Sequence, residues 1–468
     1  MSDDRAWPDG ALFGSISTTR ELREATCDAA WIRALLEFES ALALSERDAG
    51  VVPDDHARRI AETCARTVID PAALASAARA SGTPVAPVVG ALSQAVGAEA
   101  SGWVHFGATS QDALDTAAML VTRRCLSIVL RDLAGACRAC AEHVSAHGGT
   151  IMTARTLLQP ALPTTFALKA AGWLDGLLDS RSALARVRDE RLAVQLGGAA
   201  GTLAALGPSG PEVVAGVARR LGLREPRMPW HASRARIAEV ASALAIASGT
   251  ASKIALDVVL LAQSEVGEVA EQPRDGAGTS STLPHKRNPA GAVAVGAASR
   301  RAAALAGQLL GGLAHEHERA AGAWQSEWES LGELLRSAGG AVARVAELLS
   351  ALEVDVARMR ANLDATDQVL LAERIALRLS PRLGREAAHE LLARASRAAR
   401  APGGSLRDAL VADPVAIGAL GGETVDELLD PATYLGSAAV LAARALADLA
   451  SCDAAGDAAA AVTDRGDP

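Results

Sequence analysis

The amino-acid sequence predicts an all-α protein built around a bundle of long helices. Half of its 468 residues are hydrophobic, and the strong helix formers Ala, Leu, Arg and Glu fill long stretches. Val, Ile and Thr never alternate with polar residues over a strand-length run. Clusters of glycine and proline separate the helical stretches. A chain of this length and apolar content can bury a large core, which excludes a disordered or fibrous protein.

Six segments carry apolar residues at helical spacing, and several exceed the length of an average helix. In chain order they are Ala30–Ala49, Asp112–His147, Ala161–Leu196, Ile237–Ala270, Pro289–Leu313 and Leu331–Asn362. Small residues occupy many positions, and some faces are apolar on more than one side. This pattern favours close packing in a bundle and between subunits, with a monomeric helical array as the alternative.

The breaks divide the chain into three expected parts. An N-terminal helical domain covers residues 1–110, and a central long-helix bundle domain covers residues 111–355. A C-terminal helical domain covers residues 356–468, and its Ala-, Gly- and Asp-rich tail is expected to fray from about residue 451.

Charge and composition narrow the class of protein further. The chain has 46 Lys and Arg against 55 Asp and Glu and a single Tyr, so nucleic acid is not an expected partner. The acidic start lacks an apolar stretch, and six cysteines in so long a chain do not predict a disulfide framework. The most apolar region, residues 240–270, is interrupted by Lys253, Asp257 and Glu265, which favours a buried helix over a membrane span. We therefore expect a cytoplasmic protein.

No motif indicates a metal or an organic cofactor. The pair Cys137 and Cys140 lies in a helical stretch without a second pair. His315 and His317 are two residues apart and do not share a helix face. There is no HExxH motif, no GxGxxG after a strand, no Walker loop and no GxSxG elbow. The sequence therefore predicts no cofactor.

The segment Gly276–Pro289 differs from its helical surroundings. It combines glycines with Ser280 and Ser281, and it also contains Lys286 and Asn288. Asn288-Pro289 is a helix-start signal, with Asn as the N-cap and Pro at the first helical position. Lys286 and Asn288 are thus expected where a helix N-terminus presents free N–H groups and its positive dipole end. We interpret the segment as a carboxylate or phosphate site, with a capped linker as the alternative.

Three other loops have a similar composition. The loop His105–Asp112 contains Thr109, Ser110 and Gln111 and leads into a helix with the spacing of a capping box. The loop Arg155–Thr164 contains Thr156 and Gln159, and Leu196–Thr202 is rich in glycine. Each loop alone could be an ordinary cap. Together they predict helix N-termini around an anionic small molecule, with Lys286 as its counter-charge.

The segment Thr279–Pro289 resembles the signature loop of the fumarase/aspartase superfamily, usually written GSSxMPxKxNP. The other loops resemble that family's substrate loops. Further segments resemble its 3-carboxy-cis,cis-muconate cycloisomerase branch: Trp230-His231, Glu316–Arg319, Trp324–Trp328 and Leu429–Gly436. The resemblance implies an all-helical homotetramer whose active sites are shared between subunits. It implies a catalytic Ser280 and substrate-binding residues Thr109, Ser110, Gln111, Thr156, Gln159, Ser281, Lys286 and Asn288.

The sequence departs from the family pattern at four positions. Thr279 replaces a glycine and Leu283 a methionine, while Leu157 and Pro160 stand where many members have a histidine. The resemblance implies proton transfer next to a carboxylate of a small polycarboxylate, which closes a lactone ring in the catabolism of aromatic compounds. One alternative is a β-eliminating lyase that releases fumarate from a nitrosuccinate-like or adenylosuccinate-like compound. The other is an inactive helical scaffold.

Overall fold

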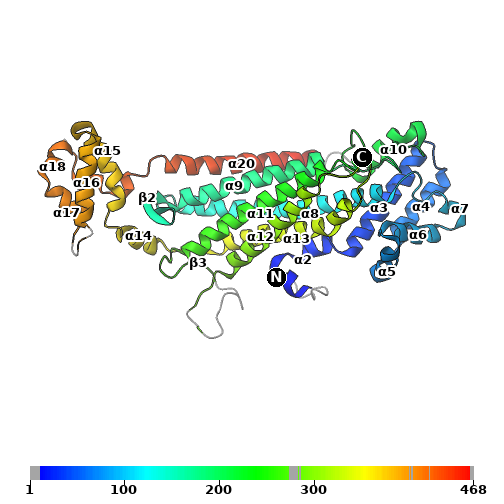
Figure 1. The fold of residues 1–468 in the computed structure, drawn as a ribbon, viewed down its shortest axis with the longest axis horizontal. Helices are drawn as coiled ribbons and strands as arrows, with labels where there is room; N and C mark the ends of the chain where they lie inside the picture. Colours follow the sequence, from blue (N-terminus) through cyan, green and yellow to red (C-terminus); the bar gives the residue numbers. More distant parts are fainter. Residues whose placement is uncertain are drawn as a thin grey trace. The chain divides into compact units, whose positions relative to one another are not determined.

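The computed structural model describes residues 11–272, 283, 286–399, 401, 404–420 and 422–463. They are overwhelmingly helical, which confirms the predicted fold class (Figure 1). The chain divides into two compact units. Unit 1 consists of Met1–Ala134, Asp179–Lys253 and Ala294–Val345, and unit 2 consists of Gly135–Leu178, Ile254–Val293 and Ala346–Pro468. The division into three parts expected from the sequence stays a prediction.

Unit 1 contains one helix of 21 residues, α3, and several shorter ones, most of them near the N-terminus. They are α1 (Ala11–Ser17), α2 (Arg20–Ala25), α3 (Asp28–Asp48), α4 (Asp54–Arg66), α5 (Pro71–Ser81), α6 (Val85–Val96), α7 (Ala98–Ser101) and α10 (Gly210–Leu221), with a π-helical turn at Val187–Arg191 and a 3-10 turn at Gly207–Ser209. The longest, α3, packs against α4 and α10. Its buried face includes Leu35, Phe38 and Leu42, at the helical spacing that the sequence shows.

Five long helices each contribute residues to both units. They are α8 (Ser110–Ala146), α9 (Phe166–Arg186), α11 (Ala235–Leu261), α12 (Ala290–Gly311) and α13 (Ala323–Ser350). In unit 1, hydroxyl groups connect neighbouring helices at places where small residues let the backbones approach. Ser180 of α9 donates to Thr250 of α11, and Ser299 of α12 donates to the carbonyl oxygen of Ser248 of α11. Such contacts tie the helices into the predicted bundle.

Helix α11 is long and apolar enough to cross a membrane by length and composition. Buried helices in the core of a protein have the same properties, and α11 makes the inter-helix bonds just described. The helix begins directly after Arg234, which belongs to the candidate site below.

Unit 2 combines ends of the long helices with two small sheets and a C-terminal helical part. Its further elements are β1 (Ile151–Thr156), β2 (Gln159–Thr165), β3 (Val269–Glu271), β4 (Leu352–Val354), α14 (Val356–Asp364), α15 (Ala372–Leu383), α16 (Arg385–Ala399), α17 (Leu406–Val411), α18 (Pro414–Leu420), α19 (Val425–Leu428) and α20 (Ala438–Thr463), with 3-10 turns at Val369–Leu371 and Pro431–Thr433. A separate cluster of buried apolar residues, from Leu363 to Leu429, forms the core of the C-terminal part.

The hairpin of β1 and β2 differs from the sequence expectation, which placed residues 151–160 in a loop and began a helix at Ala161. The two strands pair antiparallel, with Ile151 opposite Thr165 and Thr156 opposite Gln159. Prolines at 160 and 163 hid the strand, because proline is unfavourable in regular sheets. A two-stranded hairpin tolerates it, since each strand has an edge without a partner.

Candidate active site

The predicted site residues fall into two groups in the described structure. Thr109, Ser110 and Gln111 belong to unit 1, at the start of α8. Thr156, Gln159, Lys286 and Asn288 belong to unit 2. Ser280 and Ser281, together with Thr279, lie outside the described residues.

Asp112, in the first turn of α8, holds the loop that precedes the helix. Its side chain is fully buried and accepts four hydrogen bonds. The backbone N–H groups of Thr109, Gly197 and Gly198 donate to it at 3.0, 3.0 and 2.9 Å, and Nε2 of His231 donates at 2.6 Å. The bond to Thr109 is half of the capping box that the sequence predicted. Asp112 therefore fixes the first loop, the glycine-rich turn and His231 in one arrangement.

Gln111 and Thr109 face an arginine that the sequence analysis did not assign to the site. The amide nitrogen of Gln111 donates to Asp115 at 3.1 Å and to the carbonyl oxygen of His231 at 2.9 Å. These two bonds orient its amide oxygen toward Arg319, whose Nη1 lies 3.5 Å from that oxygen and from Oγ1 of Thr109. A hydroxyl, an amide oxygen and a guanidinium thus lie together. The hydroxyl of Thr109 and the guanidinium of Arg319 are donors that suit a carboxylate.

Arg319 is held by main-chain oxygens of the glycine-rich turn. Its Nη2 donates to the carbonyl oxygen of Gly198 at 2.7 Å and to that of Ala199 at 3.2 Å. Its Nε is buried and has no hydrogen-bond partner among the described residues. Burial lowers the pKa of Arg319, and the charges of Asp112 and Asp115 oppose that effect. Nη1, whose two contacts are both 3.5 Å long, is therefore the donor left for an anionic ligand.

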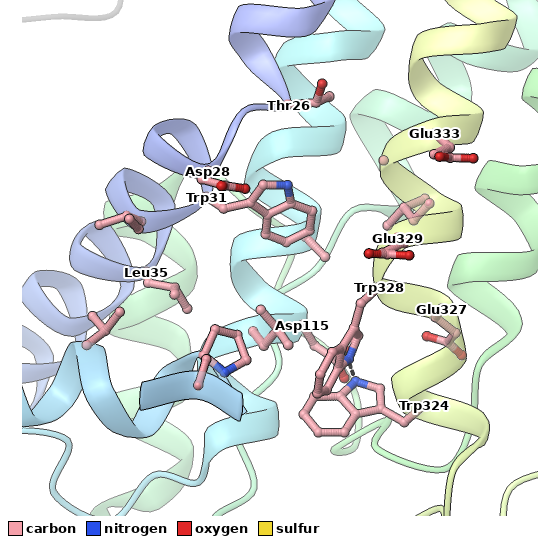
Figure 2. Close-up of a pocket in the computed structure, with 18 of the residues that line it drawn as sticks. Thr26, Asp28, Trp31, Leu35, Asp115, Trp324, Glu327, Trp328, Glu329 and Glu333 are labelled. Atoms are coloured by element: carbon pink, nitrogen blue, oxygen red, sulfur yellow. Dashed lines mark hydrogen bonds between the residues drawn. The ribbon is translucent and has the colours of Figure 1, made fainter. Parts of the chain in front are cut away.

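A buried ion-pair network holds Asp115, the residue to which Gln111 donates. Arg234 donates to both oxygens of Asp115, at 2.7 and 3.0 Å, and to Glu327 at 3.0 Å. The indole N–H of Trp324 donates to Asp115 at 3.0 Å (Figure 2). Burial opposes the charge of Arg234, but the two carboxylates hold its pKa above the ordinary value. Because every charge has a partner, the network is a rigid base for the loop.

His105 begins the same loop with a left-handed backbone, at a φ of 58°. Its Nδ1 lies 2.6 Å from Oε1 of Glu39, on α3. Burial opposes protonation of the ring, but the charge and hydrogen bond of Glu39, with the charge of Asp112, raise the pKa of His105. The ion pair ties the loop to α3 and compensates the unfavourable backbone conformation.

On unit 2, Thr156 and Gln159 form the last pair of the β1–β2 hairpin, and both are exposed. The turn between them consists of Leu157 and Leu158, with φ values of 51° and 65°. Positive φ at both central residues is the pattern of a type I′ turn, which usually contains Asn and Gly. The two leucines are 98% and 72% exposed. The hairpin tip thus presents polar and apolar side chains that the described residues of unit 2 leave exposed.

The hairpin is anchored by Arg155, the residue before Thr156. Its guanidinium donates to both oxygens of Glu268, at 2.9 and 2.7 Å, and the side chain of Glu268 is fully buried. Asn362 donates to the same carboxylate at 2.8 Å. This bidentate ion pair fixes the direction in which the hairpin leaves the unit.

Lys286 and Asn288 lie just before α12, which begins one residue later than the sequence predicted. Both line a cavity of about 1110 Å³ that also contains Glu271 and Asp355. The helix N-terminus is not open, in contrast to the sequence expectation. The N–H groups of Gly291 and Ala292 donate to the Glu271 carboxylate at 3.0 and 2.8 Å. An acidic residue of the chain itself therefore binds there, and the exposed Lys286 side chain is left to attract an anion.

The sequence analysis found Asp112 only as part of a capping box, and it missed the other residues that position the first loop: Asp115, His231, Arg234, Arg319 and Glu327. Three of them stand in segments whose resemblance to the cycloisomerase branch was recognised. Their roles depend on contacts between residues about 90 to 210 positions apart, which a single sequence does not reveal.

Comparison with known proteins decides the family. Residues 14–334 match the family described as Lyase, and residues 368–445 match the adenylosuccinate lyase C-terminus. The chain belongs to this lyase family. The match confirms the resemblance to the fumarase/aspartase superfamily that the sequence indicated.

Individual relatives within the family resemble the chain over nearly its whole length. A 3-carboxy-cis,cis-muconate cycloisomerase of Pseudomonas aeruginosa is 41% identical over 444 residues, 94% of this chain and 97% of the relative. A nitrosuccinate lyase of Streptomyces davaonensis is 42% identical over 450 residues, 94% of each chain. The crystal structure of the 3-carboxy-cis,cis-muconate lactonizing enzyme from Pseudomonas putida superposes with a TM-score of 0.86 at 39% identity, covering 94% of this chain and 99% of that one.

Proposed function

We propose that the protein is a cycloisomerase that converts 3-carboxy-cis,cis-muconate into a lactone. The observation that carries the proposal is the cluster of Arg319, Thr109 and Gln111, in which Nη1 of Arg319 lies 3.5 Å from the side-chain oxygens of the other two residues. Several relatives named for this reaction support it, at 35 to 41% identity. A substrate with three carboxylates suits a site in which Lys286 and Arg319 supply positive charge.

The reaction is an isomerisation and balances without a co-reactant. A carboxylate oxygen of the substrate adds to a carbon of its own double bond, and the neighbouring carbon takes up a proton. Charge develops on the adjacent carboxylate in the transition state, where the guanidinium of Arg319 and the hydroxyl of Thr109 stabilise it. Ser280 supplies the proton, with Lys286 holding a second carboxylate. No external nucleophile is needed, which agrees with Leu157 and Pro160 at the positions of the family histidines.

The active protein is a homotetramer in the cytoplasm, with active sites composed of loops from different subunits. Thr109, Ser110 and Gln111 come from one chain, Thr156 and Gln159 from another, and Ser280, Ser281, Lys286 and Asn288 from a third. The exposed hairpin tip at Leu157 and Leu158 supports this arrangement, because leucines exposed on one chain become buried at a subunit contact. The enzyme uses no cofactor and has neither nucleic acid nor a membrane as a partner. Light scattering should show a tetramer at micromolar concentration, and a stable monomer would contradict the shared site.

A small substrate panel tests the reaction. The purified protein is incubated separately with 3-carboxy-cis,cis-muconate, nitrosuccinate and adenylosuccinate, and the products are identified by NMR. We expect a lactone from the muconate, at a rate unaffected by a chelator, and no fumarate from the other two. No turnover of any compound would favour an inactive scaffold.

Elimination from nitrosuccinate is the second candidate function. The 42% identity to a nitrosuccinate lyase favours it, and both reactions stabilise the same kind of charge on a carboxylate. Release of fumarate and nitrite with the muconate left intact would establish this candidate. Adenylosuccinate is a weaker candidate, because Ser81–Pro87 lacks the His-Asp-Val element of lyases that act on that nucleotide.

A further inference from the structure

Unit 1 contains a cavity that takes no part in the proposed reaction. It has a volume of about 460 Å³ and opens between α3, α5 and α6 on one side and α8 and α13 on the other (Figure 2). Aliphatic side chains make up much of its wall: Ile32, Leu35, Leu74, Ala78, Val88 and Leu331. A space of this size and lining is typical of a small-molecule site.

Three tryptophans line the cavity and make it aromatic. Trp31 of α3 points toward α13, and Trp324 and Trp328 of α13 point back toward α3 (Figure 2). The rings of Trp324 and Trp328 lie 4.9 Å apart in an edge-to-face arrangement. The indole N–H of Trp324 is bonded to Asp115, but Nε1 of Trp328 is buried and has no partner among the described residues. Buried donors are normally satisfied, so a spare one at a cavity wall indicates a missing acceptor.

The charge of the wall excludes the substrate class of the proposed reaction. Five carboxylates line the cavity, on Asp28, Asp115, Glu327, Glu329 and Glu333, against the two guanidinium groups of Arg234 and Arg336. Glu333 also pairs with Arg301 at 2.7 Å, so the wall carries an excess of two negative charges, and a polycarboxylate is repelled from it. Arg234 is also fully engaged by Asp115 and Glu327, so it offers no charge to an anion.

We propose that this cavity is a second ligand site, which binds a planar aromatic molecule that is uncharged or cationic. The tryptophan faces and aliphatic walls cover the ring, and an acceptor on the ligand receives the N–H of Trp328. The acidic rim and the indole faces favour a positive charge on the ligand. The ion-pair network of Asp115, Arg234 and Glu327 separates the cavity from Gln111, which makes the two sites distinct.

Three probes that share one ring system but are cationic, neutral or anionic test the site by titration calorimetry on the full-length protein. The probes are 2-naphthylmethylamine, 2-naphthalenemethanol and 2-naphthoate. We expect one site per chain for the amine and the alcohol, and an affinity for the amine at least about tenfold above that for the naphthoate at low salt. The proposal would be overturned if the amine and the naphthoate bind with equal affinity. It would also be overturned if the amine fails to bind, or if the alcohol fails to bind.

Two neighbouring alanines of α5 provide a matched pair of variants. Ala78 lines the cavity, so Ala78→Phe should fill it and weaken binding of the amine by about tenfold or more. Ala77 is exposed and does not line it, so Ala77→Phe should bind like the wild type. Trp328→Phe keeps an aromatic ring and removes the N–H, and should weaken binding of the alcohol several-fold. Wild-type affinity in a folded Ala78→Phe or Trp328→Phe protein would refute the site.

Discussion

Glu46 of α3 gives the protein a dependence of stability on pH that a single substitution should remove. The residue is fully buried, and neither carboxyl oxygen has a hydrogen-bond partner among the described residues. Burial, followed by the charge of Glu39, raises the pKa of Glu46 to about 9. The side chain is thus a neutral acid in the folded protein at neutral pH.

The size and sign of the effect follow from the two pKa values. In the unfolded chain a glutamate ionises near pH 4.5, whereas folded Glu46 keeps its proton up to about pH 9. Between these values the unfolded state binds fewer protons, so the free energy of unfolding falls as pH rises. Over the three pH units from 5 to 8 this loss amounts to about 4 kcal/mol, at about 1.4 kcal/mol per unit. Glu46→Gln cannot release a proton and should not show this loss.

Denaturant unfolding of wild type and Glu46→Gln at pH 5, 6, 7 and 8 measures the difference directly. With each step up in pH, the free energy of unfolding of the variant should rise relative to that of the wild type. If the two free energies of unfolding differ by the same amount at all four pH values, the difference comes only from burying the unpaired amide of the new glutamine. That result would refute the reasoning. Glu62→Gln is the control, because residue 62 is exposed on α4 and its replacement should leave the pH profile unchanged.

Three predictions concern the proposed active site. Ser280→Ala should lower kcat by about 10² to 10⁴ without changing the thermal midpoint, because a positioned acid or base contributes that factor. Lys286→Met should lower kcat/KM by about 30-fold, equivalent to about 2 kcal/mol, and raised salt should lower kcat/KM of the wild type. Asp112→Asn keeps the side-chain size but offers one acceptor oxygen instead of two, so two of four bonds are lost. It should cost about 3 kcal/mol of stability and lower kcat/KM through displacement of Thr109, measured by denaturant unfolding and steady-state kinetics.

Each of these predictions has an outcome that contradicts it. Near-wild-type turnover of Ser280→Ala would remove that serine from proton transfer. Arg287→Met is the control for Lys286→Met, because the Arg287 guanidinium already pairs with Glu353 at 2.9 Å. If kcat/KM falls equally in both variants, Lys286 acts only as one of several surface charges. An Asp112→Asn enzyme with unchanged stability and kinetics would show that the four bonds do not hold the loop.

The sequence was informative where structure is local. The segment expected as Asp112–His147 forms α8 at Ser110–Ala146, because its helix formers and apolar spacing act within a few turns. The hairpin at 151–165 was missed, since its turn uses two leucines in place of the expected Asn and Gly. Local propensity has no signal for a turn whose conformation is imposed by its surroundings.

The loops of the candidate site could be predicted from their motifs, but the long-range contacts that hold these loops could not. The loop around Thr109 was found from its capping pattern, but the anchor of that loop depends on His231 and Gly197, more than 80 residues away. The start of α12 shows the same limit. The sequence indicates a helix N-terminus with open donors, and Glu271, twenty residues upstream, bonds to them.

That bond holds together the two ends of the connection between β3 and α12. Glu271 ends the strand, and its carboxylate is fixed to the first turn of the helix, so the two ends of the connection are held together by contacts outside it. Changing the length of such a loop alters its closure entropy by only about 0.6 kcal/mol per doubling. The length of the connection can therefore change at little cost in stability, while Glu271 keeps its bonds to the first turn of α12.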